Sequence, residues 1–176
     1  MAKALILIDI QNFYFGEKGL TGCVQASQNA KELLSFFRER NMPVFHVMHD
    51  IDRGSLKANE KYLMDIHDNV KPVEGETVIV KLTPGSFKGT DLLPRLKEKE
   101  IDELVICGMM SHMCVDTTTR EAFDLGFKCT VIHDACATRP LSFNGVEVPA
   151  EHVHASAMAA LSFAFANLMT VEEFTA

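Results

Sequence analysis

The chain has 176 residues, of which 47% are hydrophobic and 23% are charged, and these values are typical of an ordinary globular domain. Its 24 acidic residues outnumber its 17 basic residues and give a net charge of −7, which opposes binding to nucleic acid and to anionic membranes. No apolar run reaches the roughly 20 residues that a membrane-spanning helix needs. We therefore expect a single domain over residues 1–176 that binds a small molecule.

The N-terminal segment and the cysteines point to a reducing compartment. The segment M-A-K-A-L-I-L-I-D-I has one lysine, meets an aspartate after a short apolar run and offers no small-residue cleavage site, so we expect no secretory signal. The five cysteines are odd in number and form no C-x-x-C pair, which is typical of free thiols. We expect a cytoplasmic location.

Short apolar runs rich in β-branched residues recur along the chain. They lie at 4–8, 43–47, 77–80, 103–107 and 129–133, with a weaker run at 167–171. Such runs are typical of strands buried on both faces of a sheet. Segments with helical spacing lie between them at 24–40, 90–100, 114–125 and 150–165. This alternation predicts a three-layer α/β/α sandwich around a mainly parallel, roughly six-stranded, doubly wound sheet.

Sheets of this kind bind ligands at the carboxyl ends of their strands, so the residues that follow each run carry the information on function. Asp9 follows the first run, Lys81 follows the third, and the segment G-M-M-S-H-M-C, which ends at Cys114, follows the fourth. The second run is followed by His49, Asp50 and Asp52. An acid, a lysine and a thiol are therefore expected at one edge of the sheet.

Cys114 stands where a helix is expected to begin. Unpaired backbone N–H groups and the positive end of the helix dipole favour a thiolate there, and Lys81 would add to this effect. We therefore expect the pKa of Cys114 to lie below the free value of about 8.5. The carboxylate of Asp9 is suited to taking the thiol proton and handing it to a leaving group.

Four segments of the chain resemble the isochorismatase-like cysteine hydrolases. They are I-L-I-D-I-Q-N-F at 6–13, V-K-L-T-P-G-S-F-K-G-T-D-L at 80–92, V-I-C-G-M-M-S-H-M-C-V-D-T-T-T-R-E-A-F-D-L-G at 105–126 and I-H-D-A-C-A-T at 132–138. The resemblance spans nearly the whole chain and implies the same three-layer fold. It also implies that the Asp–Lys–Cys triad of the family falls on Asp9, Lys81 and Cys114.

The resemblance implies a covalent mechanism in which the sulfur of Cys114 attacks a carbonyl or amidine carbon and an amine leaves. Isochorismatases proper cleave a vinyl ether and lack the nucleophilic cysteine, so Cys114 favours the amidase-like branch, which includes nicotinamidases and carbamoyl-group hydrolases. Three alternatives stay open: ether hydrolysis of the isochorismatase type, a redox-active thiol protein, and a catalytically silent ligand-binding relic of the fold. A dinucleotide-binding protein is not expected, because no G-x-G-x-x-G follows the first apolar run.

Family members also hold a non-proline cis peptide before the cysteine. The resemblance places it between Met109 and Met110, where it would direct the Met110 N–H toward the same pocket as the Cys114 N–H and form an oxyanion hole. Four residues beside the matched motifs are expected to line the substrate pocket: Phe13, Phe87, Met110 and His112.

The nicotinamidase branch holds a divalent metal through an Asp-x-His pair after the second strand and a later histidine. In this chain Asp50 matches the aspartate, but Asp52 stands in the place of the histidine, and His67 is only a loose match for the later ligand. We therefore predict no metal and no cofactor.

The helical segment at 150–165 is rich in alanine and phenylalanine. It carries more apolar surface than one sheet face can cover. Members of the family that the chain resembles are usually dimers or larger. We therefore expect a homo-oligomer.

Overall fold

The computed structural model describes residues 2–50 and 56–176. The strands are β1 (Ala2–Ile8), β2 (Val44–His49), β3 (Thr77–Lys81), β4 (Ile101–Met109), β5 (Lys128–Ala137), β6 (Leu141–Phe143), β7 (Val146–Val148) and β8 (Asn167–Met169). The α-helices are α1 (Cys23–Glu39), α2 (Leu92–Glu98), α3 (Asp116–Asp124), α4 (Ala150–Ala164) and α5 (Val171–Thr175). Among the described residues, the remaining elements are three 3₁₀ helices, η1 (Asn12–Tyr14), η2 (Ala58–Met64) and η3 (Asp68–Val70), and one π-helical turn, η4 (Ser111–Val115).

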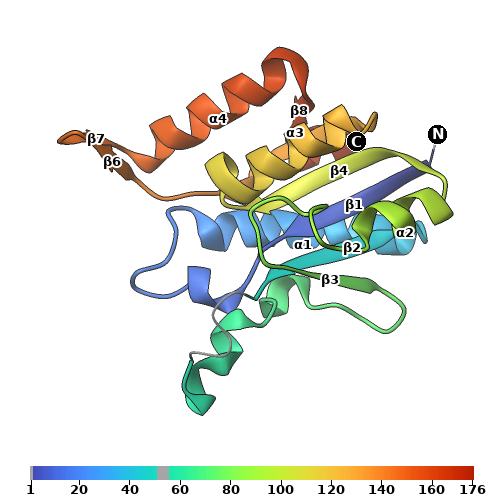
Figure 1. Ribbon diagram of the computed structural model, residues 1–176, viewed down its shortest axis with the longest axis horizontal. Helices are drawn as coiled ribbons and strands as arrows, with labels where there is room; N and C mark the ends of the chain where they lie inside the picture. The colour runs from blue at the N-terminus through green and yellow to red at the C-terminus, as the bar shows by residue number, and fades with distance from the viewer. Residues whose placement is uncertain (1, 51–55) are drawn as a thin grey trace.

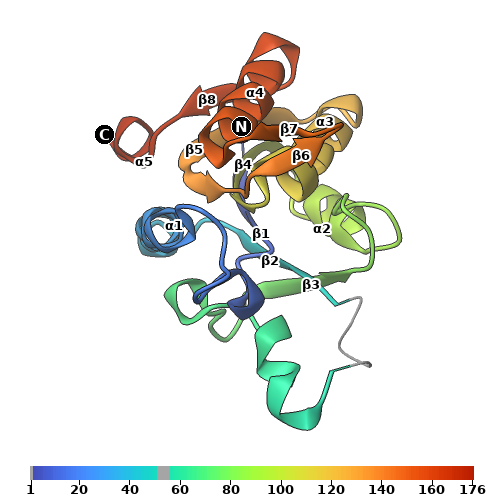
Figure 2. The ribbon, with the colours of Figure 1, turned by 90° about the vertical axis from the view of Figure 1, so that its left-hand side faces the viewer.

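Six strands form one parallel sheet in the order β3-β2-β1-β4-β5-β8. Helices cover both faces: α1 and α5 lie on one side, and α2 and α3 on the other (Figure 2). The predicted α/β fold with a six-stranded parallel sheet is therefore confirmed. No helix in the described part of the chain is long and apolar enough to cross a membrane.

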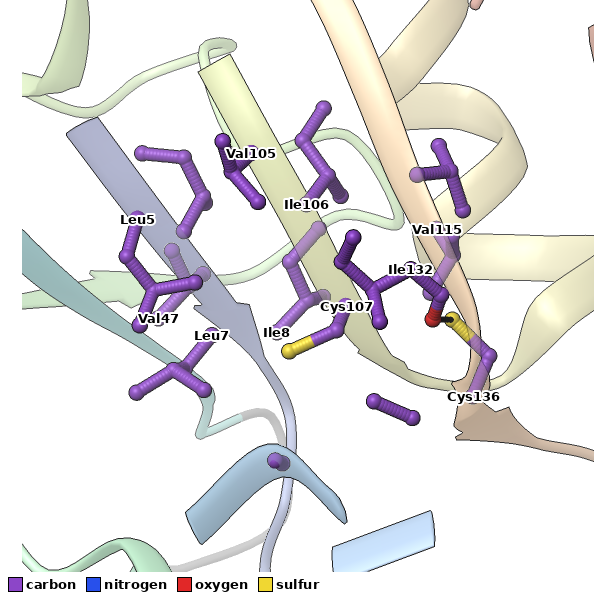
Figure 3. Packing of buried hydrophobic residues seen from close by; sticks show 14 of the residues in the cluster. Leu5, Leu7, Ile8, Val47, Val105, Ile106, Cys107, Val115, Ile132 and Cys136 are labelled. Carbon is purple, nitrogen blue, oxygen red and sulfur yellow. Dashed lines mark hydrogen bonds between the residues drawn. The ribbon is translucent and has the colours of Figure 1, made fainter. Parts of the chain in front are cut away.

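The centre of the sheet carries the hydrophobic core. Figure 3 shows side chains of β1, β4 and β5 packed against one another, among them Leu5, Ile106 and Ile132. Helix α1 closes one face, because its buried residues recur at helical spacing from Cys23 to Phe37. The two central strands β1 and β4 are thus fixed by packing on both sides, and their carboxyl ends are held at a defined place.

The sequence prediction missed the antiparallel pair β6 and β7. This hairpin extends from the body of the molecule just before α4, at the end of the sheet where the strands have their carboxyl ends (Figure 1). Its turn contains Asn144 and Gly145, both with positive φ, which is the conformation of the tight turn that Asn-Gly favours.

Candidate active site

Asp9 comes directly after β1, at the centre of the sheet. Its backbone has a positive φ of 52°, a region that aspartate enters more readily than most residues. Its N–H donates to Val47 O at 2.9 Å, and the Gln11 N–H donates back to Asp9 O at 2.9 Å. The side chain is fully buried, so the tight turn holds a carboxylate inside the protein at the end of the sheet.

Lys81 is the last residue of β3, two strands away from β1. Two strand spacings amount to about 10 Å, a gap that a long lysine side chain helps to bridge. Its ammonium nitrogen lies 2.8 Å from Asp9 Oδ2, 3.3 Å from Cys114 Sγ and 3.0 Å from Thr83 O. The side chain is almost completely buried, and these three contacts match the three donors of an ammonium group.

Cys114 lies in the π-helical turn η4, directly before α3. The loop enters this turn through a cis peptide bond between Met109 and Met110. Two hydrogen bonds tie the turn to its surroundings: Ser111 Oγ lies 2.8 Å from His154 Nδ1 on α4, and His112 Nδ1 lies 2.6 Å from Thr138 Oγ1. These contacts from Ser111 and His112 help to hold the turn that carries the sulfur of Cys114.

The loop after β3 is fastened to α3. Ser86 donates its backbone N–H to Thr118 Oγ1 at 3.2 Å, and the two hydroxyl oxygens lie 2.8 Å apart. Both residues are buried. This contact joins the segment that follows Lys81 to the helix that follows Cys114, so the ammonium and the sulfur keep their separation.

The expected low pKa of Cys114 is wrong for this structure. Burial raises the pKa of the thiol to about 12, and the negative charge of Asp9 adds to the rise while Lys81 opposes it. The sequence showed the helix start and the lysine but not the depth of the site, where only 4% of Cys114 is exposed. The resting group is therefore a neutral thiol.

Burial also raises the pKa of Asp9, although the Lys81 ammonium and a hydrogen bond with Cys114 oppose this effect. A carboxylate with a raised pKa is a stronger base and is better matched to a thiol. The short contact between Lys81 and Asp9 is that of an ammonium with a carboxylate. The geometry thus allows the thiol proton to move to Asp9 when the sulfur reacts.

The expected pocket residues have different surroundings. Phe13 is partly exposed, and its ring lies 4.0 Å from that of Tyr14. Phe87 is buried in the core and stacks on Phe127. Met110 is buried, and His112 is partly exposed.

Two residues near Asp9, Lys81 and Cys114 were given no catalytic role from the sequence. Burial raises the pKa of Tyr14, and the negative charge of Asp9 raises it further, as does the charge of Cys114 when its sulfur is ionised. The phenol therefore stays protonated beside the site. His49, the last residue of β2, places one side-chain nitrogen in a group with an oxygen of Asp9 and the sulfur of Cys114, all within 4.8 Å of one another. The position of His49 at a strand end was the available signal.

Two of the three loosely matched metal ligands, Asp50 and His67, lie within the described residues. Asp52 lies outside the described residues. His67 uses Nδ1 to accept the Asn69 N–H at 3.2 Å, and its ring stacks on Phe15. Within the described residues, neither Asp50 nor His67 belongs to a group of three ligand atoms close enough to share one ion.

Residues 3–173 match the family model described as the Isochorismatase domain. The chain belongs to the isochorismatase family. A relative from Bacillus subtilis (strain 168), the uncharacterized isochorismatase family protein YddQ, is 49% identical over 180 residues, which cover 99% of each chain. The crystal structure of an isochorismatase from Pseudomonas putida KT2440 is similar with a TM-score of 0.91 and 36% identity, covering 97% of this chain and 88% of the other.

A more distant relative carries a reaction in its name. Nicotinamidase 3 from Arabidopsis thaliana is 27% identical over 184 residues, which cover 97% of this chain and 85% of the relative. The family membership makes this chain an isochorismatase-family hydrolase.

Proposed function

We propose that this chain is a cysteine hydrolase that cleaves a C–N bond in an amide, a carbamoyl compound or a ureide. The observation that carries the proposal is the position of the Lys81 ammonium, 2.8 Å from Asp9 Oδ2 and 3.3 Å from Cys114 Sγ. The likeness to a nicotinamidase supports the choice of an amide-like bond.

In the first half of the reaction, the sulfur of Cys114 attacks the carbonyl carbon while the thiol proton passes to Asp9. The carbonyl oxygen becomes an oxyanion, which accepts hydrogen bonds from the backbone N–H groups of Met110 and Cys114. Protonated Asp9 then donates its proton to the leaving nitrogen, the C–N bond breaks, and a thioester remains on Cys114.

In the second half, a water molecule attacks the thioester and gives one proton to Asp9. The C–S bond breaks, the acid product leaves, and the sulfur regains its proton from Asp9. Lys81 keeps a positive charge beside both groups throughout, so it stabilises the transient thiolate as well as the carboxylate. Its burial keeps water from screening this charge.

The burial of the Cys114 thiol favours this route over a redox role. All five cysteines are free and buried, and a redox-sensing thiol is typically exposed and of low pKa. Cleavage of a vinyl ether is the second candidate reaction, and a silent ligand-binding protein is the third. The small-molecule substrate, a cytoplasmic location and the absence of a required cofactor remain parts of the proposal.

The experiment is a screen of primary amides, carbamoyl compounds, ureides and a vinyl ether, with ammonia release as the measurement for the nitrogen compounds. For the best substrate we expect Asp9→Asn and Cys114→Ser to lower kcat/KM by at least about 10³-fold. Cys129→Ser, which alters another buried thiol, is the matched control and should retain activity. A substrate-dependent mass increase on Cys114 would identify the thioester. Full activity in Cys114→Ser would reject the covalent mechanism.

A further inference from the structure

Three potential metal ligands of different kinds meet at the candidate active site. One side-chain oxygen of Asp9, one ring nitrogen of His49 and the sulfur of Cys114 all lie within 4.8 Å of one another. Carboxylate, imidazole and thiolate together form a ligand set that zinc accepts. This group shares no residue with the Asp50, Asp52 and His67 set that the sequence suggested.

The histidine has a free donor or acceptor position. His49 Nε2 is buried, and no hydrogen bond to another described residue satisfies it. Asp9 is fully buried, and its oxygens make no hydrogen bond within the described chain apart from their contacts with Lys81 and Cys114. Buried polar atoms without partners are costly, so an ion bound between these groups would satisfy atoms that the protein alone leaves unpaired.

The backbone of His49 is held in place by a buried glutamine. Gln11 Oε1 accepts the His49 N–H at 2.9 Å, and Gln11 Nε2 donates to His49 O at 2.9 Å. The same Nε2 also donates to Met64 O at 2.5 Å. Because both hydrogen bonds of Gln11 to His49 involve the main chain, we expect the end of β2 to keep its place when the side chain of His49 is replaced.

We propose that a thiophilic divalent cation of the zinc class binds Asp9, His49 and Cys114, and that its binding inhibits the enzyme. Ligand atoms around a tetrahedral zinc ion lie about 3.5 Å apart. The ligand atoms of Asp9, His49 and Cys114 lie within 4.8 Å of one another, so each distance between them needs to shorten by roughly 1 Å at most. A bare cation is smaller than a water molecule and fits between atoms that solvent does not reach.

The charge of Lys81 opposes a cation, and the ligands offset it. Lys81 can keep its ion pair with one oxygen of Asp9 while the other oxygen binds the metal. The S–H bond of Cys114 breaks, a sulfur–metal bond forms, and the proton leaves to solvent. Two anionic ligands then face the ammonium and the dication. The sulfur bound to the metal is no longer available as a nucleophile, so metal binding blocks the reaction. The inhibitory effect rests on the proposed function, whereas the metal binding itself does not.

The test is a titration of the full chain with cobalt(II), which reports sulfur ligation through a thiolate-to-metal charge-transfer absorption. We expect the band to appear with about one cobalt per chain, to vanish in Cys114→Ser and to persist in Cys129→Ser. His49→Ala and, as a second variant, His49→Asn should weaken binding by about tenfold or more. His152→Gln, which alters an exposed histidine of α4, is the matched control and should bind as the parent does.

Zinc should compete with cobalt and abolish the band. Absence of the band, or a band of equal affinity in both folded His49 variants, would overturn the metal site. If hydrolysis fails in every substrate screen but the band behaves as expected, the metal site stands and the proposed function falls. If zinc binds while activity persists at saturation, the inhibitory role is rejected.

Discussion

Gly108 of β4 lies directly beside Ile8 of β1, and a β-carbon at position 108 would overlap the carbonyl oxygen of Ile8. Gly108 also has a φ of +132°, which side chains rarely allow. This close approach brings the residue before Asp9 next to the residue before the Met109–Met110 peptide. The two halves of the candidate site are therefore joined where only glycine fits.

We predict that Gly108→Ala destabilises the protein by about 3 kcal/mol or more, because a steric overlap adds to an unfavourable φ. The measurement is the free energy of unfolding from urea titration. Gly126→Ala is the matched control: Gly126 has a φ of +92° but open space around it, so its cost should stay near 1 kcal/mol. Equal losses in the two variants would contradict the overlap.

The six sheet strands were predictable because each lies in a short apolar run, although only the central strands such as β1 and β4 are buried over most of their length, and β3 and β8 are partly exposed. The hairpin of β6 and β7 was not predicted because its strands have three residues each and are largely exposed. Its Asn144-Gly145 turn was nevertheless a usable signal. Short exposed strands lack the burial that produces a recognisable apolar pattern.

The sequence predicted which residues of the candidate site lie at the carboxyl ends of strands. Asp9 and Lys81 end or follow strands, and parallel strands bring such residues to one edge. The raised pKa of Cys114 was not predictable, because burial depends on how loops from distant parts of the chain cover the sulfur. The strand end indicated the edge of the sheet for His49, but its approach to within 4.8 Å of Asp9 and Cys114 was not predictable, because it depends on side-chain packing in the folded chain.

Lys81→Met should lower both activity and stability. The substitution removes the ammonium and leaves the carboxylate of Asp9 buried without its ion-pair partner, which typically costs about 3–5 kcal/mol. Activity should fall by about 10²-fold or more because the transient thiolate loses its positive neighbour. Urea titration and the rate of ammonia release measure the two effects separately.

A double variant separates the two roles of this ion pair. Asp9→Asn together with Lys81→Met removes both charges, so it should recover part of the stability lost in Lys81→Met while remaining inactive. Lys3→Met is a control for a lysine at the surface, where the ion pair with Glu103 is partly exposed, and it should cost less than about 1 kcal/mol. If the stability lost in the double variant equals the sum of the losses in Asp9→Asn and Lys81→Met, the two residues are not a coupled pair.

Glu76 should make stability depend on acidic pH. Burial alone would raise its pKa, but hydrogen bonds from Arg38, the Val73 N–H and His46 lower it to about 2. Since the folded pKa lies below the ordinary value of 4.5, the contribution is complete above that value and is lost as pH falls toward 2. It should amount to roughly 2–3 kcal/mol.

Unfolding free energies measured from about pH 5 down to about pH 2, the range in which this carboxyl titrates, test this contribution. Glu76→Gln should be less stable near neutral pH and should show a flatter decline through the window. Glu39→Gln, which changes an exposed glutamate, should follow the parent. A parallel decline in Glu76→Gln and the parent would show that other groups cause the acid sensitivity.

Self-association should involve the hairpin of β6 and β7. Phe143 and Val146 pair across its two strands, so their side chains share one face, and they are 76% and 63% exposed. A two-stranded hairpin is marginally stable on its own, and a second copy of the chain would cover this face.

We expect light scattering at micromolar concentration to give the mass of a dimer or a larger assembly. The double variant Phe143→Ser with Val146→Ser should shift this mass toward that of the monomer. Phe163→Ser, on α4, changes a phenylalanine that is 90% exposed outside the hairpin, and its association should match that of the parent. A monomeric parent would contradict the expected assembly, and loss of association only in Phe163→Ser would move the interface to α4.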